Sequence, residues 1–182
     1  YEKINGLYQL LSGNRKNSRM DIETYVQRHY LEQILEAANQ RFQDMSAGQF
    51  ELRMCDIDKA GTGKNRGLDL MVYSAVTGKV REVRTLSGGE SFMAALSLAL
   101  GMADQIQESS AAINLDMMFI DEGFGSLDEH SRDQAVKVLQ NMAEGEKLIG
   151  IISHVTELKQ EIEDQLIVTK DDQGSHTRWQ IS

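Results

Sequence analysis

The sequence predicts an α/β fold: a mostly parallel sheet flanked by helices, preceded by an antiparallel meander and a long N-terminal helix. From residue 88 onward, helix-period apolar patterns alternate with short apolar runs, which is typical of parallel strands joined by right-handed helical crossovers. The pattern of residues 49–83 is instead typical of short strands joined by turns. The 182 residues, 41% hydrophobic and 26% charged, suffice for one globular domain with a sizeable core.

The first long element is a helix predicted over residues 21–45, which Gly48 is suited to end. Its polar start, around Thr24 and Arg28, is expected to project away from the core. Apolar side chains recur along the rest at helical spacing, at Leu31, Ile34, Leu35, Ala38, Phe42 and Met45.

The meander is predicted from strands over residues 49–56, 68–75 and 79–83. Phe50, Leu52 and Met54 alternate along the first strand and indicate its buried face. The second strand turns into the third at Thr77-Gly78, and residues 59–67 are expected to form a flexible loop.

The remaining elements alternate. We expect helices over 88–107, 129–143 and 155–162, buried strands over 115–120 and 148–152, and a closing hairpin of 166–170 and 176–181. The inward positions expected of the first helix are Phe92, Leu96, Ala99, Leu100, Ala103 and Ile106, and those of the second are Ala135, Val138, Leu139 and Met142.

Composition bounds the class of protein. No apolar run is long enough to span a membrane and no signal-peptide pattern is seen, so a membrane-spanning or secreted protein is not expected; the single Cys55 fits a reducing cytoplasm. The net charge of −9 is uneven, with 13 basic and 12 acidic residues in 1–90 but 6 and 16 in 91–182. A basic group in the first half is either a phosphate-contacting face or a solvated loop and hairpin. Its members are Lys59, Lys64, Arg66, Lys79, Arg81 and Arg84.

The segment Leu86-Ser87-Gly88-Gly89-Glu90 is the first candidate site. Ser87 can accept from the amide of Glu90, whose side chain can reach back to the amide of Ser87, which is a capping box. The two glycines leave the amides of the first helical turn uncovered. Such a helix start is suited to bind an anion, and phosphate above all.

Asp121 and Glu122 end a hydrophobic strand and form the second candidate site. One carboxylate can hold a magnesium ion while the other polarises a water molecule. The carboxyl end of a parallel strand is where α/β sites form. The alternative is a strand that merely ends in acidic residues at the surface.

Two further candidate positions follow later in the sequence. Asp128 is suited to cap the helix that begins at Glu129, and Ser126 with Glu129 suggests a second capping box; a loop that crosses a subunit interface is the functional alternative. His154 follows a strand expected to neighbour the one that ends at Asp121. An imidazole there can stabilise charge on a phosphate.

The segment Gly61-Thr62-Gly63-Lys64 is not a phosphate-binding loop. That motif needs a glycine five positions before Gly63, where Asp58 stands, and a hydroxyl residue after the lysine, where Asn65 stands. The sequence therefore has carboxylates and an anion-binding helix start without a loop of its own to hold a nucleotide.

These motifs, in this order, are similar to the C-terminal half of an ABC-type ATPase. The string from Phe119 to Asp128 narrows the resemblance, since membrane-transporter ATPases usually have proline where this chain has Gly123. From about residue 48 to 182 the chain resembles the C-terminal lobe of the SbcC family. That family comprises bacterial ATPases of DNA double-strand-break repair, related to the structural-maintenance-of-chromosomes (SMC) proteins.

The resemblance implies roles at two ATP molecules sandwiched between two heads. Asp121 would support Mg²⁺, Glu122 would activate the attacking water, and His154 would contact the γ-phosphate. The ATP of the opposite head would be met by Ser87, Gly88, Gly89 and Glu90, with Asp128 reaching across the same interface.

The resemblance also implies partners. Residues 1–46 would be the root of a coiled coil and 47–182 the C-terminal ATPase lobe; the start at Tyr1 suggests a fragment that lacks the P-loop lobe. A second head as homodimer, an SbcD-type metal-dependent nuclease and double-stranded DNA would complete the machinery, with no membrane involved. A lobe of a chromosome-structuring or other DNA clamp with little turnover is the alternative, and a transporter role is disfavoured.

Overall fold

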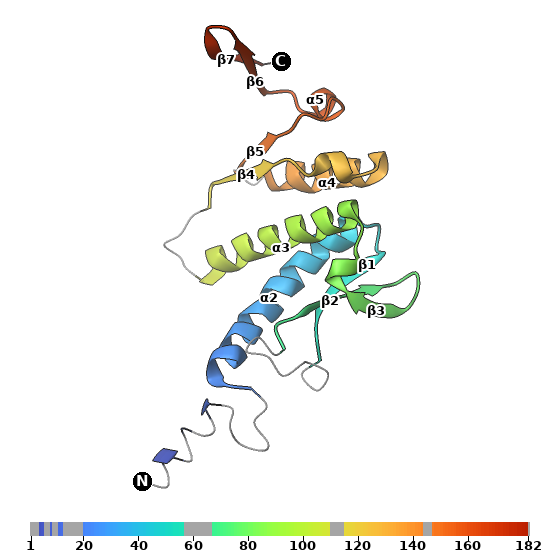
Figure 1. Ribbon diagram of the computed structural model, residues 1–182, viewed down its shortest axis with the longest axis vertical. Helices are drawn as coiled ribbons and strands as arrows, with labels where there is room; N and C mark the ends of the chain where they lie inside the picture. Colours follow the sequence, from blue (N-terminus) through green and yellow to red (C-terminus); the bar gives the residue numbers. More distant parts are fainter. Residues whose placement is uncertain are drawn as a thin grey trace.

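The structure is a computed structural model that describes residues 4, 5, 8, 11, 12, 20–56, 67–109, 115–143 and 147–181. The predicted flexible loop lies almost wholly outside the described residues, as do its basic side chains Lys59, Lys64 and Arg66. In Figure 1 two long helices cross near the middle of the molecule, with a small antiparallel sheet beside them. A third helix and the remaining strands follow toward the C-terminus.

Helix α2 (Ile22–Met45) is the predicted long helix, confirmed at both ends. Asp21 caps it, because its side chain accepts from the amide of Thr24 at 2.7 Å. At the other end Gly48 has a φ of +73°, and its amide donates to the carbonyl of Gln43 at 2.7 Å. The C-terminal half buries one face through Leu35, Ala38, Phe42 and Met45. Large apolar side chains near the start are exposed: Ile22, Tyr25, Val26 and Tyr30.

The predicted meander is present as an antiparallel sheet with the strand order β1-β2-β3. Its strands are β1 (Phe50–Met54), β2 (Leu70–Ser74) and β3 (Lys79–Glu82), followed by the short 3-10 helix η1 (Val83–Thr85). The side chain of Asn39 on α2 forms two hydrogen bonds with the outer edge of β1. Its side-chain amide donates to the carbonyl of Leu52 at 2.8 Å, and its oxygen accepts from the Leu52 amide at 2.7 Å. Helix and sheet are thereby held as one unit.

Helix α3 (Gly88–Ser109) packs against α2 where the two helices cross. The two backbones meet closely at Gly101, where an added Cβ would lie 2.7 Å from the carbonyl oxygen of Ile34. The close approach rotates the buried face of α3 relative to the prediction. Ala99 and Ile106, expected to face inward, are exposed, whereas Met93 and Ser97 are buried.

The parallel part of the fold consists of β4 (Met117–Asp121) and β5 (Leu148–Ile152), joined through η2 (Phe124–Ser126) and α4 (Glu129–Ala143). Parallel pairing was expected, but within the described residues it is limited to these two strands. The prediction that both strands are buried was wrong for one face. Helix α4 covers only the other face, so alternate side chains are exposed: Met117, Phe119, Leu148 and Ile152.

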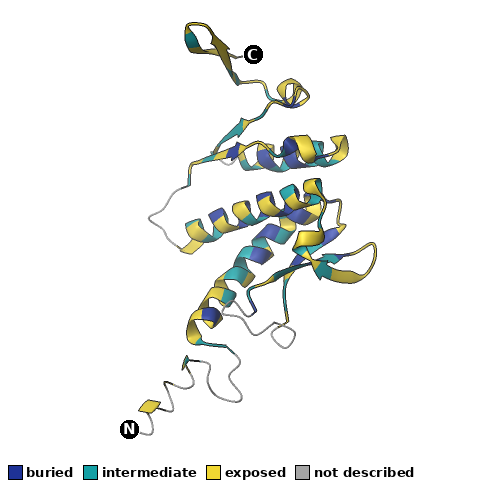
Figure 2. Cartoon of the chain, in the orientation of Figure 1, coloured by how far each residue is buried: buried dark blue, intermediate teal, exposed yellow. Residues whose placement is uncertain are grey.

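The chain ends with α5 (Leu158–Glu161) and the predicted hairpin of β6 (Gln165–Asp171) and β7 (Gly174–Gln180). Helix α5 is shorter than the predicted 155–162 segment. The hairpin stands at the end of the molecule opposite the start of α2 and is largely exposed in Figure 2.

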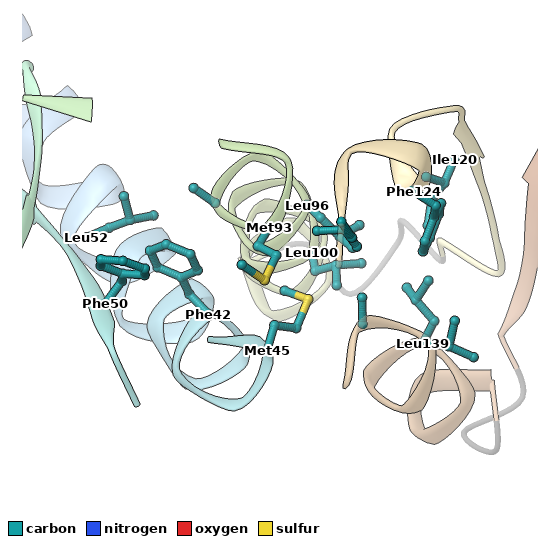
Figure 3. Packing of buried hydrophobic residues seen from close by; sticks show 14 of the residues in the cluster. Phe42, Met45, Phe50, Leu52, Met93, Leu96, Leu100, Ile120, Phe124 and Leu139 are labelled. Carbon is teal, nitrogen blue, oxygen red and sulfur yellow. The ribbon is translucent and has the colours of Figure 1, made fainter. Parts of the chain in front are cut away.

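A continuous hydrophobic core joins α2, the meander, α3 and α4 (Figure 3). Phe42 and Phe50 stack with ring centroids 6.0 Å apart where α2 meets β1. Farther along, Phe124 is fully buried, next to Ile120 of β4 and Leu139 of α4. Among the described residues, no helix is both long and apolar enough to cross a membrane.

Candidate functional site

Asp121, Glu122 and His154 meet at the carboxyl end of the β4–β5 pair. Asp121 ends β4 and is paired with Ile152, the last residue of β5. The amide of Glu122 donates to the carbonyl of Ile152 at 2.8 Å and so extends the pairing by one residue. Nδ1 of His154 lies 2.8 Å from Oε2 of Glu122. The imidazole and carboxylate that were predicted to be neighbours are therefore in direct contact.

This arrangement is open to solvent. The side chains of His154 and Glu122 are 79% and 49% exposed. A carboxylate that an imidazole orients, but that water still reaches, is suited to take a proton from a water nucleophile. Negative charge that develops beside it can be stabilised by the imidazole.

Asp121 offers a second exposed carboxylate next to this pair. Over the described part of the chain, no group of three or more His, Cys, Asp or Glu side chains is arranged to hold a metal ion. Magnesium does not require such a cage, since it keeps several waters and commonly takes one or two carboxylates together with phosphate oxygens. Asp121 is therefore a suitable partial ligand for Mg²⁺, with the remaining ligands from water and a phosphate.

The backbone at Glu122 and Gly123 positions this carboxylate. Both residues have positive φ values, +60° and +98°. At Gly123 an added Cβ would lie 2.1 Å from the ring of Phe92, a residue of α3. That ring also meets Phe124 edge to face, with centroids 5.0 Å apart. The turn after β4 thus packs directly against helix α3.

The Leu86–Glu90 segment forms the predicted capping box at the start of α3. The amide of Ser87 donates to Oε2 of Glu90 at 2.8 Å, and the amide of Glu90 donates to Oγ of Ser87 at 3.3 Å. Ser87 and Gly88 are exposed. The segment therefore leaves the Ser87 hydroxyl and the start of the helix accessible from solvent, which is the arrangement that an anion site at a helix start requires.

Asp128 caps α4, as predicted. Its two carboxylate oxygens accept from the amide and the hydroxyl of Ser131 at 2.9 and 2.8 Å. The hydrogen bond from the Ser131 amide holds the pKa of Asp128 below its ordinary value, so the carboxylate is charged at neutral pH. The predicted capping box between Ser126 and Glu129 was wrong. Asp128 takes the capping position, and the Ser126 hydroxyl instead donates to the carbonyl of Gly123 at 2.7 Å.

A pocket of about 230 Å³ gathers the Leu86–Glu90 segment and Asp128. Ser87, Gly89, Glu90 and Asp128 line it together with the turn after α2. The two loops touch tightly: an added Cβ on Gly89 would lie 2.8 Å from the carbonyl oxygen of Ser126.

The candidate residues therefore fall into two groups. Ser87, Gly89, Glu90 and Asp128 line the pocket, and Gly88 lies in the same segment outside the lining. The second group, Asp121, Glu122 and His154, is absent from the lining and lies at the edge of the β4–β5 sheet. Helix α3 connects the groups, because it begins with the pocket segment and presses Phe92 against Gly123.

Sequence reasoning missed two residues that shape these groups. Phe92 was expected only as a core position, and no sequence signal indicated its contact with Gly123. Arg81 was expected in a basic surface group, but its guanidinium pairs with Glu90 at 3.3 Å. A basic residue nine positions before an acidic one carries no recognisable spacing signal.

Comparison with solved structures gives the fold first, which is similar to that of SMC ATPase head domains. A structure from work on ATP-driven dimerisation and DNA-stimulated activation of SMC ATPases aligns with a TM-score of 0.66 at 15% identity, covering 86% of this chain and 88% of the other. The Smc head domain of Pyrococcus furiosus, bound to the C-terminal domain of ScpA, aligns with a TM-score of 0.60 at 17% identity. It covers 86% of this chain and 36% of that one.

Sequence comparison then gives the relatives. The family described as SbcC/RAD50-like, Walker B motif, matches residues 68–141. The SbcC component of the nuclease SbcCD from Treponema pallidum is 46% identical over 175 residues, covering 96% of this chain and 16% of the relative. The Vibrio cholerae protein of the same name is 44% identical, covering 98% of this chain and 17% of the relative. Over nearly its whole length the chain is similar to these SbcC proteins, and it spans about a sixth of their length.

Proposed function

We propose that this chain is the C-terminal lobe of an ATPase head in an SbcC-type protein. ATP binding and hydrolysis between two such heads would control DNA-end processing by an SbcD-type nuclease in repair and recombination. The observation that carries the proposal is the contact between Glu122 and His154 at the carboxyl end of β4, directly after Asp121. The separate pocket with Ser87 and Asp128 supports a second, partner-directed role.

The proposed chemistry is phosphoryl transfer to water. Glu122 accepts the proton of the attacking water. His154 holds the Glu122 carboxylate in place and contacts the γ-phosphate. Asp121 would help to hold Mg²⁺, and the ion would supply charge neutralisation when bound. Phosphoryl transfer requires positioning and charge stabilisation more than covalent chemistry, and these exposed polar groups can supply both.

The pocket segment serves the ATP of the opposite head in this proposal. Ser87, Gly88 and Gly89 meet its γ-phosphate, and Asp128 reaches across the interface between heads. The pocket lining supports this, because Ser87 and Asp128 line one pocket from which Asp121, Glu122 and His154 are absent.

The exposed apolar face of β4 and β5 supports a missing P-loop lobe. A two-stranded parallel sheet with one bare apolar face is not a stable end state in water, so we propose that the nucleotide-binding lobe of the full-length protein covers it. Residues 47–182 would then be one half of the head. Residues 1–46, which include the exposed apolar side chains at the start of α2, would form the root of the coiled coil.

The relatives are named as the SbcC component of a nuclease, SbcCD, and this name supports a nuclease partner and a DNA substrate for the complex. The nuclease metals would lie on the SbcD-type partner, and the complex would act in the cytoplasm. Lys79 and Arg84, both exposed, stay candidates for contact with the DNA backbone.

Substitution of Glu122 by Gln in the full-length protein tests the proposal. The variant should bind ATP and keep two heads associated, but its hydrolysis rate should fall by roughly 10²- to 10⁴-fold, because the general base is lost. Single-turnover hydrolysis and size-exclusion chromatography with and without ATP measure both effects. Hydrolysis at the unmodified rate would remove Glu122 from the role of base.

A further inference from the structure

Among the basic residues of the meander that the structure describes, Arg81 contacts the Leu86–Glu90 segment. It lies on β3, and its side chain is 35% exposed. One terminal nitrogen, Nη1, donates to the carbonyl of Thr85 at 2.8 Å. The other, Nη2, donates to Oε2 of Glu90 at 3.3 Å. A single planar guanidinium thus bridges the residue before Leu86 and the last residue of the Leu86–Glu90 segment.

The oxygen that Arg81 contacts is the one that fixes Ser87. Oε2 of Glu90 also accepts from the amide of Ser87 at 2.8 Å, and the amide of Glu90 donates to the Ser87 hydroxyl at 3.3 Å. Arg81 is itself anchored, since its guanidinium lies 5.6 Å from the ring centroid of Phe50 on β1. A chain of contacts therefore runs from the meander through Arg81 and Glu90 to Ser87.

We propose that Arg81 is a positioning residue that holds the Leu86–Glu90 segment in the conformation that receives the nucleotide of the opposite head. The inference rests on the proposed function for its ligand. It differs from the surface role expected of the basic group, because both terminal nitrogens of Arg81 are engaged within the chain.

The chemistry of arginine fits this role. Glu90 is a long side chain at a partly exposed helix start, and a capping box alone leaves it free to exchange its partner with water. A rigid guanidinium fork donates to two acceptors at once, which restricts the Glu90 rotamer. Lysine carries the same charge on a flexible stem without the fork, so it should replace only part of the function.

The experiment uses the full-length protein in the Glu122→Gln background, where ATP-bound heads stay associated. Arg81→Ala should leave the affinity of separate heads for ATP unchanged, because their own nucleotide does not contact Ser87. It should weaken ATP-dependent head association by about tenfold, as expected for losing a hydrogen-bonded charged partner. Arg81→Lys should give a smaller loss, and amide hydrogen exchange at Ser87 and Glu90 should rise in the alanine variant.

Arg53→Ala is the matched control. Arg53 lies in the same sheet, pairs with Glu51 at 2.9 Å, and lies 4.1 Å from the ring centroid of Tyr73. Its replacement by alanine therefore removes similar contacts at a place far from Ser87 in the sequence. Head association and exchange at Ser87 should not change in this variant. Thermal unfolding of both variants reports any general loss of stability.

Two results would overturn the inference. One is equal head association for Arg81→Ala and Arg53→Ala. The other is unchanged exchange at Ser87 with a loss confined to DNA binding, which would assign Arg81 to the DNA surface. If the Glu122→Gln protein with Arg81 intact did not associate with ATP, the proposed function itself would fail.

Discussion

At Glu122 and Gly123 the backbone enters the left-handed region twice in succession, directly after β4. Glycine adopts such a conformation without strain, whereas proline, with φ fixed near −65°, cannot adopt the +98° of Gly123. The absence of proline at this position therefore has a structural reason. The turn brings Gly123 against Phe92 and leaves the Glu122 carboxylate beside His154.

Gly123→Ala should therefore disturb both stability and catalysis. The new methyl group would overlap the ring of Phe92 and would sit on a backbone with positive φ. Overpacking of this kind costs about 1–3 kcal/mol of unfolding free energy. We also expect a lower hydrolysis rate in the full-length protein, because the Glu122 carboxylate moves. Chemical denaturation and steady-state ATPase assays measure the two effects.

Gly125→Ala is the control for that substitution. An added Cβ there meets only the side chain of Val155, at an ordinary 3.6 Å. Its unfolding free energy should stay close to that of the unmodified protein. Equal stability of both variants would show that the Phe92 contact does not constrain the turn.

At the same scale, the sequence identified most candidate residues but not how they are held. The capping box at Ser87 and the Asp128 cap depend on side chains three residues apart, so spacing alone revealed them. The contacts of Phe92 with Gly123 and of Arg81 with Glu90 depend on how helices and strands are placed in space. No local pattern encodes such contacts.

At the scale of elements, α2 and α3 form the frame on which both groups of site residues depend. Periodicity predicted both helices, because 3.6-residue spacing and helix ends are local signals. It misjudged the inward face of α3. That face is set by the close contact at Gly101, which brings Ser97 inward and leaves Ala99 outside.

Gly101→Ala should destabilise the protein even though alanine favours a helix. Helix propensity alone predicts a gain of about 1 kcal/mol. The added Cβ, however, would lie 2.7 Å from the Ile34 carbonyl oxygen and 2.8 Å from the Ala38 amide nitrogen, and backbone atoms cannot yield locally. We expect a net loss, since overpacking of a well-packed contact costs about 1–3 kcal/mol, and more where backbone atoms must move. Denaturant unfolding decides the sign.

Ala99→Gly on the exposed face of the same helix is the comparison. It removes propensity without touching α2, so it should cost about 1 kcal/mol. If Gly101→Ala stabilised the protein by the same amount, the helices would be less tightly packed at this point than the structure indicates.

At the scale of the whole molecule, apolar surface remains exposed on the strands of the C-terminal half. Phe119 on β4 is 65% exposed and Trp179 on β7 is 67% exposed. In the hairpin, Trp179 is paired directly with Leu166 on β6, so both side chains lie on one face. The sequence could not reveal these bare faces, because an apolar strand has the same pattern whether its cover comes from its own segment or from another.

The proposed P-loop lobe should cover these faces, and the fluorescence emission of Trp179 can report when the lobe binds. Trp179 is the only tryptophan in the sequence, so its emission is assignable without substitution. The chain alone should show the emission of an exposed indole and no appreciable ATP hydrolysis. Addition of the P-loop lobe, prepared without tryptophan, should shift the emission to shorter wavelength and restore hydrolysis, because the indole loses water as the nucleotide site is completed.

Phe119→Ser should weaken the association of the two lobes, since it removes apolar surface from the β4 face, whereas Thr169→Ser on the exposed hairpin should not. Appreciable hydrolysis by the chain alone, or a complex that forms without change at Trp179 and is indifferent to Phe119→Ser, would contradict the division of the head into these two lobes.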